Sequence, residues 1–202
     1  MTQRVPSQGG TRRVNGPPTR GSPEVEKRRM PRGLDKALFL ARLDPLLTAA
    51  GMSRVYPEAS EPAAHAASLA LAGLPHYEDL WAGDLGEVVA LIAVASGARL
   101  TGADLVKRAE MLAERVAAMK DRVNGPVQAL QLVVYERAVP IQERDFVLEQ
   151  ARKAGLFPLA RARVATWVFA LGELALYSNR FPGWPARLGA TELRKLLMSP
   201  AA

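Results

Sequence analysis

The chain has 202 residues, of which 49% are apolar and 23% charged, and this is enough for a single domain with a sizeable core. It contains no cysteine and only two histidines, which excludes disulfides, thiolate metal sites, a cysteine nucleophile and most histidine-based metal sites. The net charge of +7 is concentrated in residues 1–33, which hold eight basic and two acidic side chains, so that the rest of the chain is nearly neutral.

Residues 1–33 are predicted to form a disordered tail. Glycine and proline recur throughout the segment and its apolar residues are isolated, so it cannot bury enough surface to offset the entropy of ordering. We favour a solvated linker whose arginines reflect the codon usage of a GC-rich bacterial genome, or a translation start at Met30. The alternative is a basic arm that binds nucleic acid or an acidic membrane surface, through Arg12, Arg13, Lys27, Arg28 and Arg29.

No export signal is recognised in the tail, and no apolar stretch approaches the ~20 residues that a membrane-spanning helix needs. We therefore expect a soluble cytoplasmic protein without a transmembrane segment.

The first elements after the tail are predicted to be mostly helical. A helix is expected over 34–50, kinked or divided at Pro45, with an apolar stripe made of Leu34, Leu38, Phe39, Leu40, Ala41 and Leu46. A short strand follows over 52–56. Ser60 then caps an alanine-rich helix that begins with Pro62 and ends at Leu71. Residues 75–86 are predicted to form a loop or a short hairpin.

The middle of the chain carries the clearest patterns. Residues 88–95 are continuously apolar, which is typical of a strand buried on both faces. Thr101 and Asp104 form a capping box at the start of a helix that runs to about residue 120. The apolar residues of this helix recur at steps of three and four, which predicts one buried stripe of Leu105, Ala109, Leu112, Val116 and Met119.

Two further strands are predicted, over 127–135 and 164–171, separated by a helix over 140–154. In the first strand Leu130, Leu132 and Val134 share one face, with Gln131 as the polar exception on the other. Residues 172–176 could continue the second strand or be helical. Thr191 is predicted to cap a last short helix over 192–198.

This order of strands and helices predicts a single α/β domain over 34–202. Strand, helix, strand, helix, strand with short connections is the pattern of right-handed crossovers, so we expect a mixed or parallel central sheet of about three to five strands. The order is also roughly that of restriction-nuclease-like cores, whose sites use an acidic residue two positions before a lysine. None of the lysines has an acidic residue at that position, which argues against a nuclease of this kind and leaves a catalytically inactive relative of that fold as an alternative.

The motifs of common enzymes are absent from the sequence. There is no Walker loop, no Rossmann fingerprint and no nucleophile elbow. His76 could act as a general base with Asp79, but a loop histidine of this kind is more often exposed and idle. We therefore predict no catalytic residue, no metal site and no cofactor.

Two places are candidates for a binding site. Open parallel sheets bind ligands beyond the carboxyl ends of their strands, where this chain has Ser96, Arg99, Glu136, Arg137 and Glu173. These residues could form a polar pocket, but a rim of mutual salt bridges is the favoured interpretation. The second place is Trp184, between two prolines, which could insert into a partner or cover the end of its own core.

Three functions remain open. The sequence favours a non-catalytic interaction or regulatory module that binds a protein partner, mainly because catalytic motifs are absent. The first alternative is a nucleic-acid-associated protein that uses the basic tail. The second is an enzyme whose site lies at the carboxyl ends of the strands.

Overall fold

The computed structural model describes residues 34–56, 58–72, 74, 77–98, 100–119, 121–139, 157–159, 162–178 and 180–198, with only the backbone described at 157–159 and 162. The predicted tail over 1–33 and the predicted helix over 140–154 lie outside the described residues, as do Arg99 and His76. Among the described residues, no helix combines the length and the apolar character that a membrane crossing requires.

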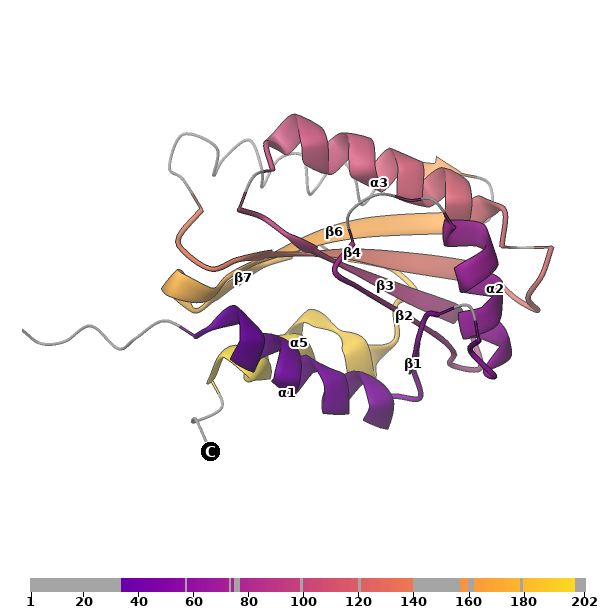
Figure 1. Ribbon diagram of the computed structural model, residues 1–202, viewed down its shortest axis with the longest axis horizontal. Coiled ribbons are helices and arrows are strands. Elements are labelled where there is room, and N and C mark those ends of the chain that lie inside the picture. Colours follow the sequence, from indigo (N-terminus) through magenta and orange to yellow (C-terminus); the bar gives the residue numbers. More distant parts are fainter. Residues whose placement is uncertain are drawn as a thin grey trace, which may run out of the picture. The chain divides into compact units, whose positions relative to one another are not determined.

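The architecture is a mixed sheet with helices on both faces, which confirms the predicted α/β class (Figure 1). The sheet has the order β1-β2-β3-β4-β6-β5, and β7 also pairs with β6. Four strands are long: β2 (Asp79–Asp84), β3 (Val89–Ser96), β4 (Val127–Tyr135) and β6 (Ala162–Ala170). Three are short: β1 (Ser53–Arg54), β5 (Phe157–Leu159) and β7 (Ala175–Tyr177).

The strand directions place three carboxyl ends at one edge of the sheet. Strands β3, β4 and β6 are mutually parallel, whereas β2 runs antiparallel to both β1 and β3. The short strands β5 and β7 both pair antiparallel with β6, β5 with residues 162–164 and β7 with residues 168–170. The chain after β6 therefore does not continue as a helix. It forms a 3-10 turn, η1 (Leu171–Glu173), and folds back as β7.

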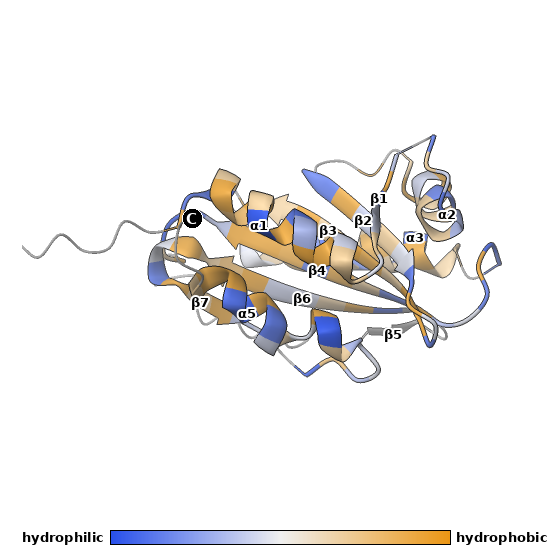
Figure 2. Ribbon diagram, turned by 90° about the horizontal axis from the view of Figure 1, so that it is seen from below, coloured by the Kyte–Doolittle hydropathy of each residue, from blue (hydrophilic) through white to orange (hydrophobic). Residues whose placement is uncertain are grey.

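In the described part of the chain, helices cover both faces of the sheet (Figure 1). Helices α1 (Lys36–Ala49) and α5 (Ala190–Met198), with the short turn η2 (Ala186–Leu188), lie on one face, and α2 (Pro62–Leu71) and α3 (Gly102–Ala117) lie on the other. The prediction that Leu130, Leu132 and Val134 share one face of β4 is confirmed, because all three pack in the apolar cluster beneath α1 and α5. Figure 2 shows that apolar residues run along the strands beneath these two helices.

Helix α1 confirms the predicted stripe only in part. Phe39 is buried, and Leu34, Leu40 and Leu46 are partly buried against the core, but Leu43 and Leu47 were not in the stripe. The buried side chains are Phe39, Leu43 and Leu47, whereas Leu38 is 39% exposed. The helix is apolar on most sides, so the pattern allowed more than one stripe. Pro45 lies inside α1 without dividing it, and the Asp35 carboxylate caps the helix by accepting a hydrogen bond of 2.9 Å from the backbone N–H of Ala37.

Three smaller predictions also need correction. Helix α2 is capped by Glu61 and not by Ser60, because the Glu61 carboxylate accepts a hydrogen bond from the Ala64 backbone. Thr191 lies inside α5, which begins one residue earlier, at Ala190. Residues 75–86 were predicted to form a loop or a short hairpin, but the described part of this segment contains a single strand, β2, which pairs along its whole length with β3.

The capping box of α3 and its buried stripe are confirmed.

A buried polar network joins the first turn of α3 to β4. The Gln131 side chain is fully buried: its Oε1 accepts a hydrogen bond of 2.9 Å from the Tyr77 hydroxyl, and its Nε2 donates one of 3.2 Å to the Leu105 carbonyl oxygen. Burial raises the pKa of Tyr77, so the phenol stays a neutral donor. The polar exception in β4 therefore fixes α3 on the sheet.

Candidate binding site at the carboxyl edge of the sheet

The parallel arrangement brings the predicted site residues to one edge of the sheet. Ser96 is the last residue of β3 and is aligned with Val134, near the end of β4. Glu136 and Arg137 follow β4 directly, and Glu173 lies in η1, just after β6. These four residues thus lie at or just after the carboxyl ends of the three parallel strands, as the sequence predicted.

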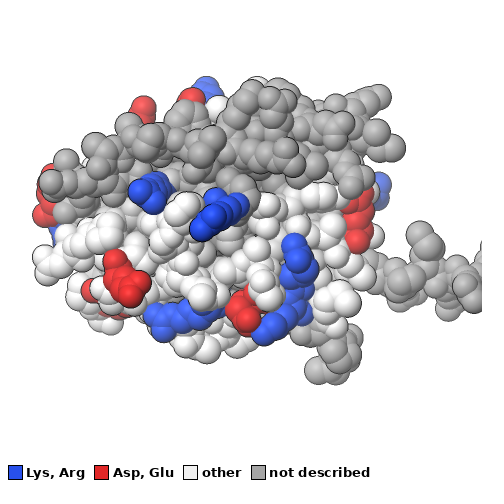
Figure 3. All heavy atoms as spheres, turned by 180° about the vertical axis from the view of Figure 1, so that it is seen from behind, with Lys and Arg blue, Asp and Glu red and all other residues white. Residues whose placement is uncertain are grey.

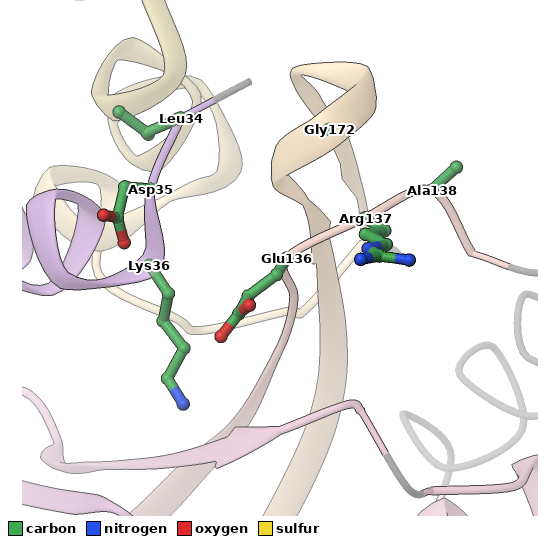
Figure 4. Close-up of a pocket in the computed structure, with 7 residues that line it drawn as sticks. All are labelled: Leu34, Asp35, Lys36, Glu136, Arg137, Ala138 and Gly172. Carbon is green, nitrogen blue, oxygen red and sulfur yellow. The ribbon is translucent and has the colours of Figure 1, made fainter. Parts of the chain in front are cut away.

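A hollow of about 470 Å³ opens at this edge (Figure 4). It is lined by Glu136, Arg137 and Ala138 from the segment after β4, by Gly172 of η1, and by the start of α1, which contributes Leu34, Asp35 and Lys36. Two of the predicted residues, Glu136 and Arg137, thus line the hollow, whereas Ser96 and Glu173 do not. The contribution of α1 was not predicted, because no sequence pattern specified which end of the sheet this helix begins at.

Gly172 allows two walls of the hollow to approach each other closely. A Cβ atom at this position would lie 3.1 Å from the Cα of Arg137 and 3.2 Å from the backbone nitrogen of Ala138. These distances are shorter than ordinary contacts between carbon atoms. The absence of a side chain at residue 172 therefore lets η1 pack directly on the backbone that carries the candidate residues.

Two of the four charged groups that line the hollow, Asp35 and Lys36, have partners, and the other two have none among the described residues. The Lys36 ammonium forms an ion pair of 2.6 Å with Glu78, and Asp35 is engaged as the cap of α1. By contrast, Glu136 and Arg137 are exposed and form no ion pair or side-chain hydrogen bond with any described residue. In Figure 4 the Glu136 carboxylate and the Lys36 ammonium extend toward the same space, whereas the Arg137 guanidinium points away from Glu136.

The residues predicted for a rim of salt bridges do not pair with one another in the described part of the chain. Glu173 instead accepts a hydrogen bond of 2.7 Å from the hydroxyl of Tyr177, on the neighbouring strand β7. Ser96 is half-buried and makes no side-chain hydrogen bond to a described residue. The edge is therefore a polar surface on which the charges of Glu136 and Arg137 have no partner among the described residues.

Trp184 lies away from this edge and covers its own core. Its ring stacks on Phe181, with ring centroids 5.2 Å apart and planes inclined by 15°, and its Nε1 donates a hydrogen bond of 2.9 Å to the Leu188 carbonyl oxygen. The loop is held by Gln128 and Arg163, which both donate to the Pro182 carbonyl oxygen, at 3.1 and 3.4 Å. Since Gln128 and Arg163 lie near the starts of β4 and β6, this loop is at the opposite end of the strands from the hollow.

No arrangement typical of a catalytic centre is found in the described residues. They contain no group of three or more side chains that could hold a metal ion. On β3 the residues from Val89 to Ala95 are apolar and buried, and Asp79 on the neighbouring strand lies 3.5 Å from the Arg54 guanidinium. Comparison with protein-family models, curated proteins and solved structures finds no match to this chain.

Proposed function

We propose that this chain is a non-catalytic module that binds a protein partner at the carboxyl edge of β3, β4 and β6. The observation that carries the proposal is the pair Glu136 and Arg137, two adjacent, exposed and oppositely charged side chains at the wall of an open hollow. The Glu136 carboxylate and the Arg137 guanidinium point to different sides and are unpaired among the described residues, so each can form charge-assisted hydrogen bonds with a partner, which fix orientation and exclude wrong partners.

A binding role accounts for this site better than a catalytic one. A general acid or base is usually held by a neighbouring group that orients it, and Glu136 has no such neighbour among the described residues. The hydroxyl at the strand ends, Ser96, has no base beside it in the described part of the chain. The proposal includes a cytoplasmic location, for which the sequence alone is the support.

Association with nucleic acid draws no support from the described residues. Their acidic side chains slightly outnumber the basic ones. On the face shown in Figure 3, blue and red groups are interspersed among uncharged residues and do not form one basic patch. The basic residues on which that alternative rests belong to 1–33, outside the described residues.

Site-specific photo-cross-linking tests the proposal. Ala138 is exposed in the wall of the hollow, and a benzophenone amino acid at this position should cross-link the full chain to one recurring protein in producing cells. Leu69, which is 53% exposed on α2, is the control position and should not yield that product. The charge reversal Glu136→Lys should reduce the yield at least fivefold, since it removes the carboxylate and adds a repulsive charge.

Two results would contradict the proposed function. One is the same mixture of products at residues 138 and 69, which would indicate random encounters. The other is a single product at residue 138 whose yield does not change with Glu136→Lys, which would place the contact elsewhere.

A further inference from the structure

Leu174, in the turn between η1 and β7, has a left-handed backbone conformation, with φ 49° and ψ 42°. It is the one residue other than glycine with a positive φ in the described part of the chain. A leucine in this region has a steric penalty from its Cβ that glycine avoids and asparagine reduces. The shape of the turn therefore does not explain why this residue is a leucine.

The conformation of Leu174 is imposed by its neighbours. Its backbone N–H donates a hydrogen bond of 3.2 Å to the carbonyl oxygen of Leu171, whose side chain is fully buried. The very next residue, Ala175, already pairs with Ala170 in the sheet. Because both sides of the turn are fixed, the backbone geometry at residue 174 does not depend on a leucine side chain.

Leu174 is 38% exposed, and two other large apolar residues are exposed on helices α1 and α5. Leu38 lies in the first turn of α1 and Met198 is the last residue of α5 (Figure 1). Helix α5 packs against both α1 and β7, so the elements that carry these three residues adjoin. Gly172, two residues before Leu174, lines the hollow.

We propose that Leu174 is an anchor residue that inserts into an apolar pocket of the protein partner, and that basic side chains form the rim of that pocket. The inference rests on the proposed function and specifies its partner. An apolar anchor buried in a pocket typically contributes much of the binding energy of an interface. The strained backbone and the partial exposure of the leucine then serve the same interaction.

The basic charge that we propose for the rim of the partner's pocket is inferred from the carboxylates around Leu174. Glu173 is its exposed neighbour, and Glu136 and Asp35 lie in the hollow beside it. The charge of Lys36 is matched by its ion pair with Glu78, which leaves Arg137 as the remaining cation that lines the hollow. Among the described residues that line the hollow or adjoin Leu174, unpaired carboxylates therefore outnumber unpaired cations, and a basic rim is complementary to them.

The test compares two variants of the full chain, Leu174→Gly and Leu174→Asn, with the matched surface variant Leu69→Ala. The probe is the protein that the benzophenone at Ala138 captures, purified and titrated against each variant. Both Leu174 variants should bind it at least tenfold more weakly, and Leu69→Ala should bind within twofold of the original chain. The melting temperature of Leu174→Asn should stay within about 2 °C of the original or rise, since asparagine relieves backbone strain.

Each other outcome overturns the inference. A fall of more than about 5 °C in the melting temperature of both Leu174 variants would show that the side chain holds the fold. Unchanged affinity would show that the partner does not contact Leu174, and acidic residues around the cross-linked segment would contradict the basic rim. In these cases the proposed function stands. If the benzophenone at Ala138 captures no protein, the proposed function fails together with this inference.

Discussion

The phenol ring of Tyr135 lies directly against the backbone of Gly97. A Cβ atom at residue 97 would come within 2.6 Å of three ring carbons of Tyr135, and the Gly97 N–H donates a hydrogen bond of 2.8 Å to the Val134 carbonyl oxygen. The Tyr135 hydroxyl in turn donates a hydrogen bond of 3.3 Å to the Leu100 carbonyl oxygen. The ring thus holds the connection between β3 and α3 onto the end of β4.

Gly97→Ala should therefore destabilise the protein by about 1–3 kcal/mol, the usual cost of forcing a methyl group into a packed site. Urea unfolding monitored by circular dichroism measures this loss. The double variant Gly97→Ala with Tyr135→Ala should lose less than the sum of the two single changes, because the clash is then removed. Strict additivity would mean that the two residues do not contact each other in solution.

Ile92→Asp should abolish cooperative folding. Ile92 is fully buried in the middle of β3, aligned with Trp81 on one side and Leu130 on the other, and no cation is available there among the described residues. An unpaired carboxylate at such a position costs more than about 4 kcal/mol. Soluble yield and thermal unfolding measure the effect, with Leu69→Asp on the exposed surface of α2 as the control. A cooperatively folded Ile92→Asp variant would show that β3 is not at the centre of the sheet.

Gln131→Leu should destabilise the protein although leucine is the more apolar residue. The substitution removes the donor to the Leu105 carbonyl oxygen and the nearer acceptor of the Tyr77 hydroxyl, which then has only the longer hydrogen bond of 3.5 Å to the Arg108 carbonyl oxygen among the described residues. A buried polar group that loses its partner costs about 1–3 kcal/mol. Adding Tyr77→Phe to this variant should recover part of the loss in urea unfolding. A Gln131→Leu protein as stable as the original would show that water satisfies both groups equally well.

The capping box of α3 should make stability depend on pH. The backbone N–H and the hydroxyl of Thr101 both donate hydrogen bonds to the Asp104 carboxylate, and they hold its pKa below the usual value. A carboxyl whose pKa is lowered on folding stabilises the protein above its unfolded pKa of about 4, and this contribution is lost as the pH falls through the folded value.

The stability difference between the original chain and Asp104→Asn should accordingly be largest near pH 6 and should shrink as the pH falls below about 4. Urea unfolding at several pH values measures this difference, with Glu114→Gln on an exposed position of the same helix as the control. A difference that stays constant down to pH 2 would mean that the Asp104 carboxylate is not engaged by Thr101.

The sequence was most informative where burial leaves one arrangement possible. The apolar runs over 88–95 and 127–135 predicted β3 and β4, because a strand buried on both faces needs apolar residues at nearly every position. The stripe of α3 was predicted because only one side of that helix is apolar. In α1, by contrast, apolar residues occur on most sides of the helix, and only packing against the sheet selected Phe39, Leu43 and Leu47.

The candidate site was partly predictable. The rule for the carboxyl ends of parallel strands placed Glu136 and Arg137 correctly, because their positions depend on local strand boundaries. The contributions of Asp35, Lys36 and Gly172 depend on contacts between segments that are far apart in the chain, and these contacts leave no local pattern. The left-handed conformation of Leu174 was likewise not predictable, since leucine rarely adopts it.

The two short strands beside β6 also protect the protein against self-association. A long apolar strand at the edge of a sheet is a template on which a second molecule can add a strand. Here β5 pairs with the first residues of β6 and β7 pairs with its last residues. Among the described residues of β6, only positions 165–167 lack a partner on the side away from β4. A three-residue opening is too short to hold an added strand, and Pro158 in β5 has no N–H to offer. A chain that ended before β7 would expose the carboxyl half of β6 and would be prone to aggregate through it.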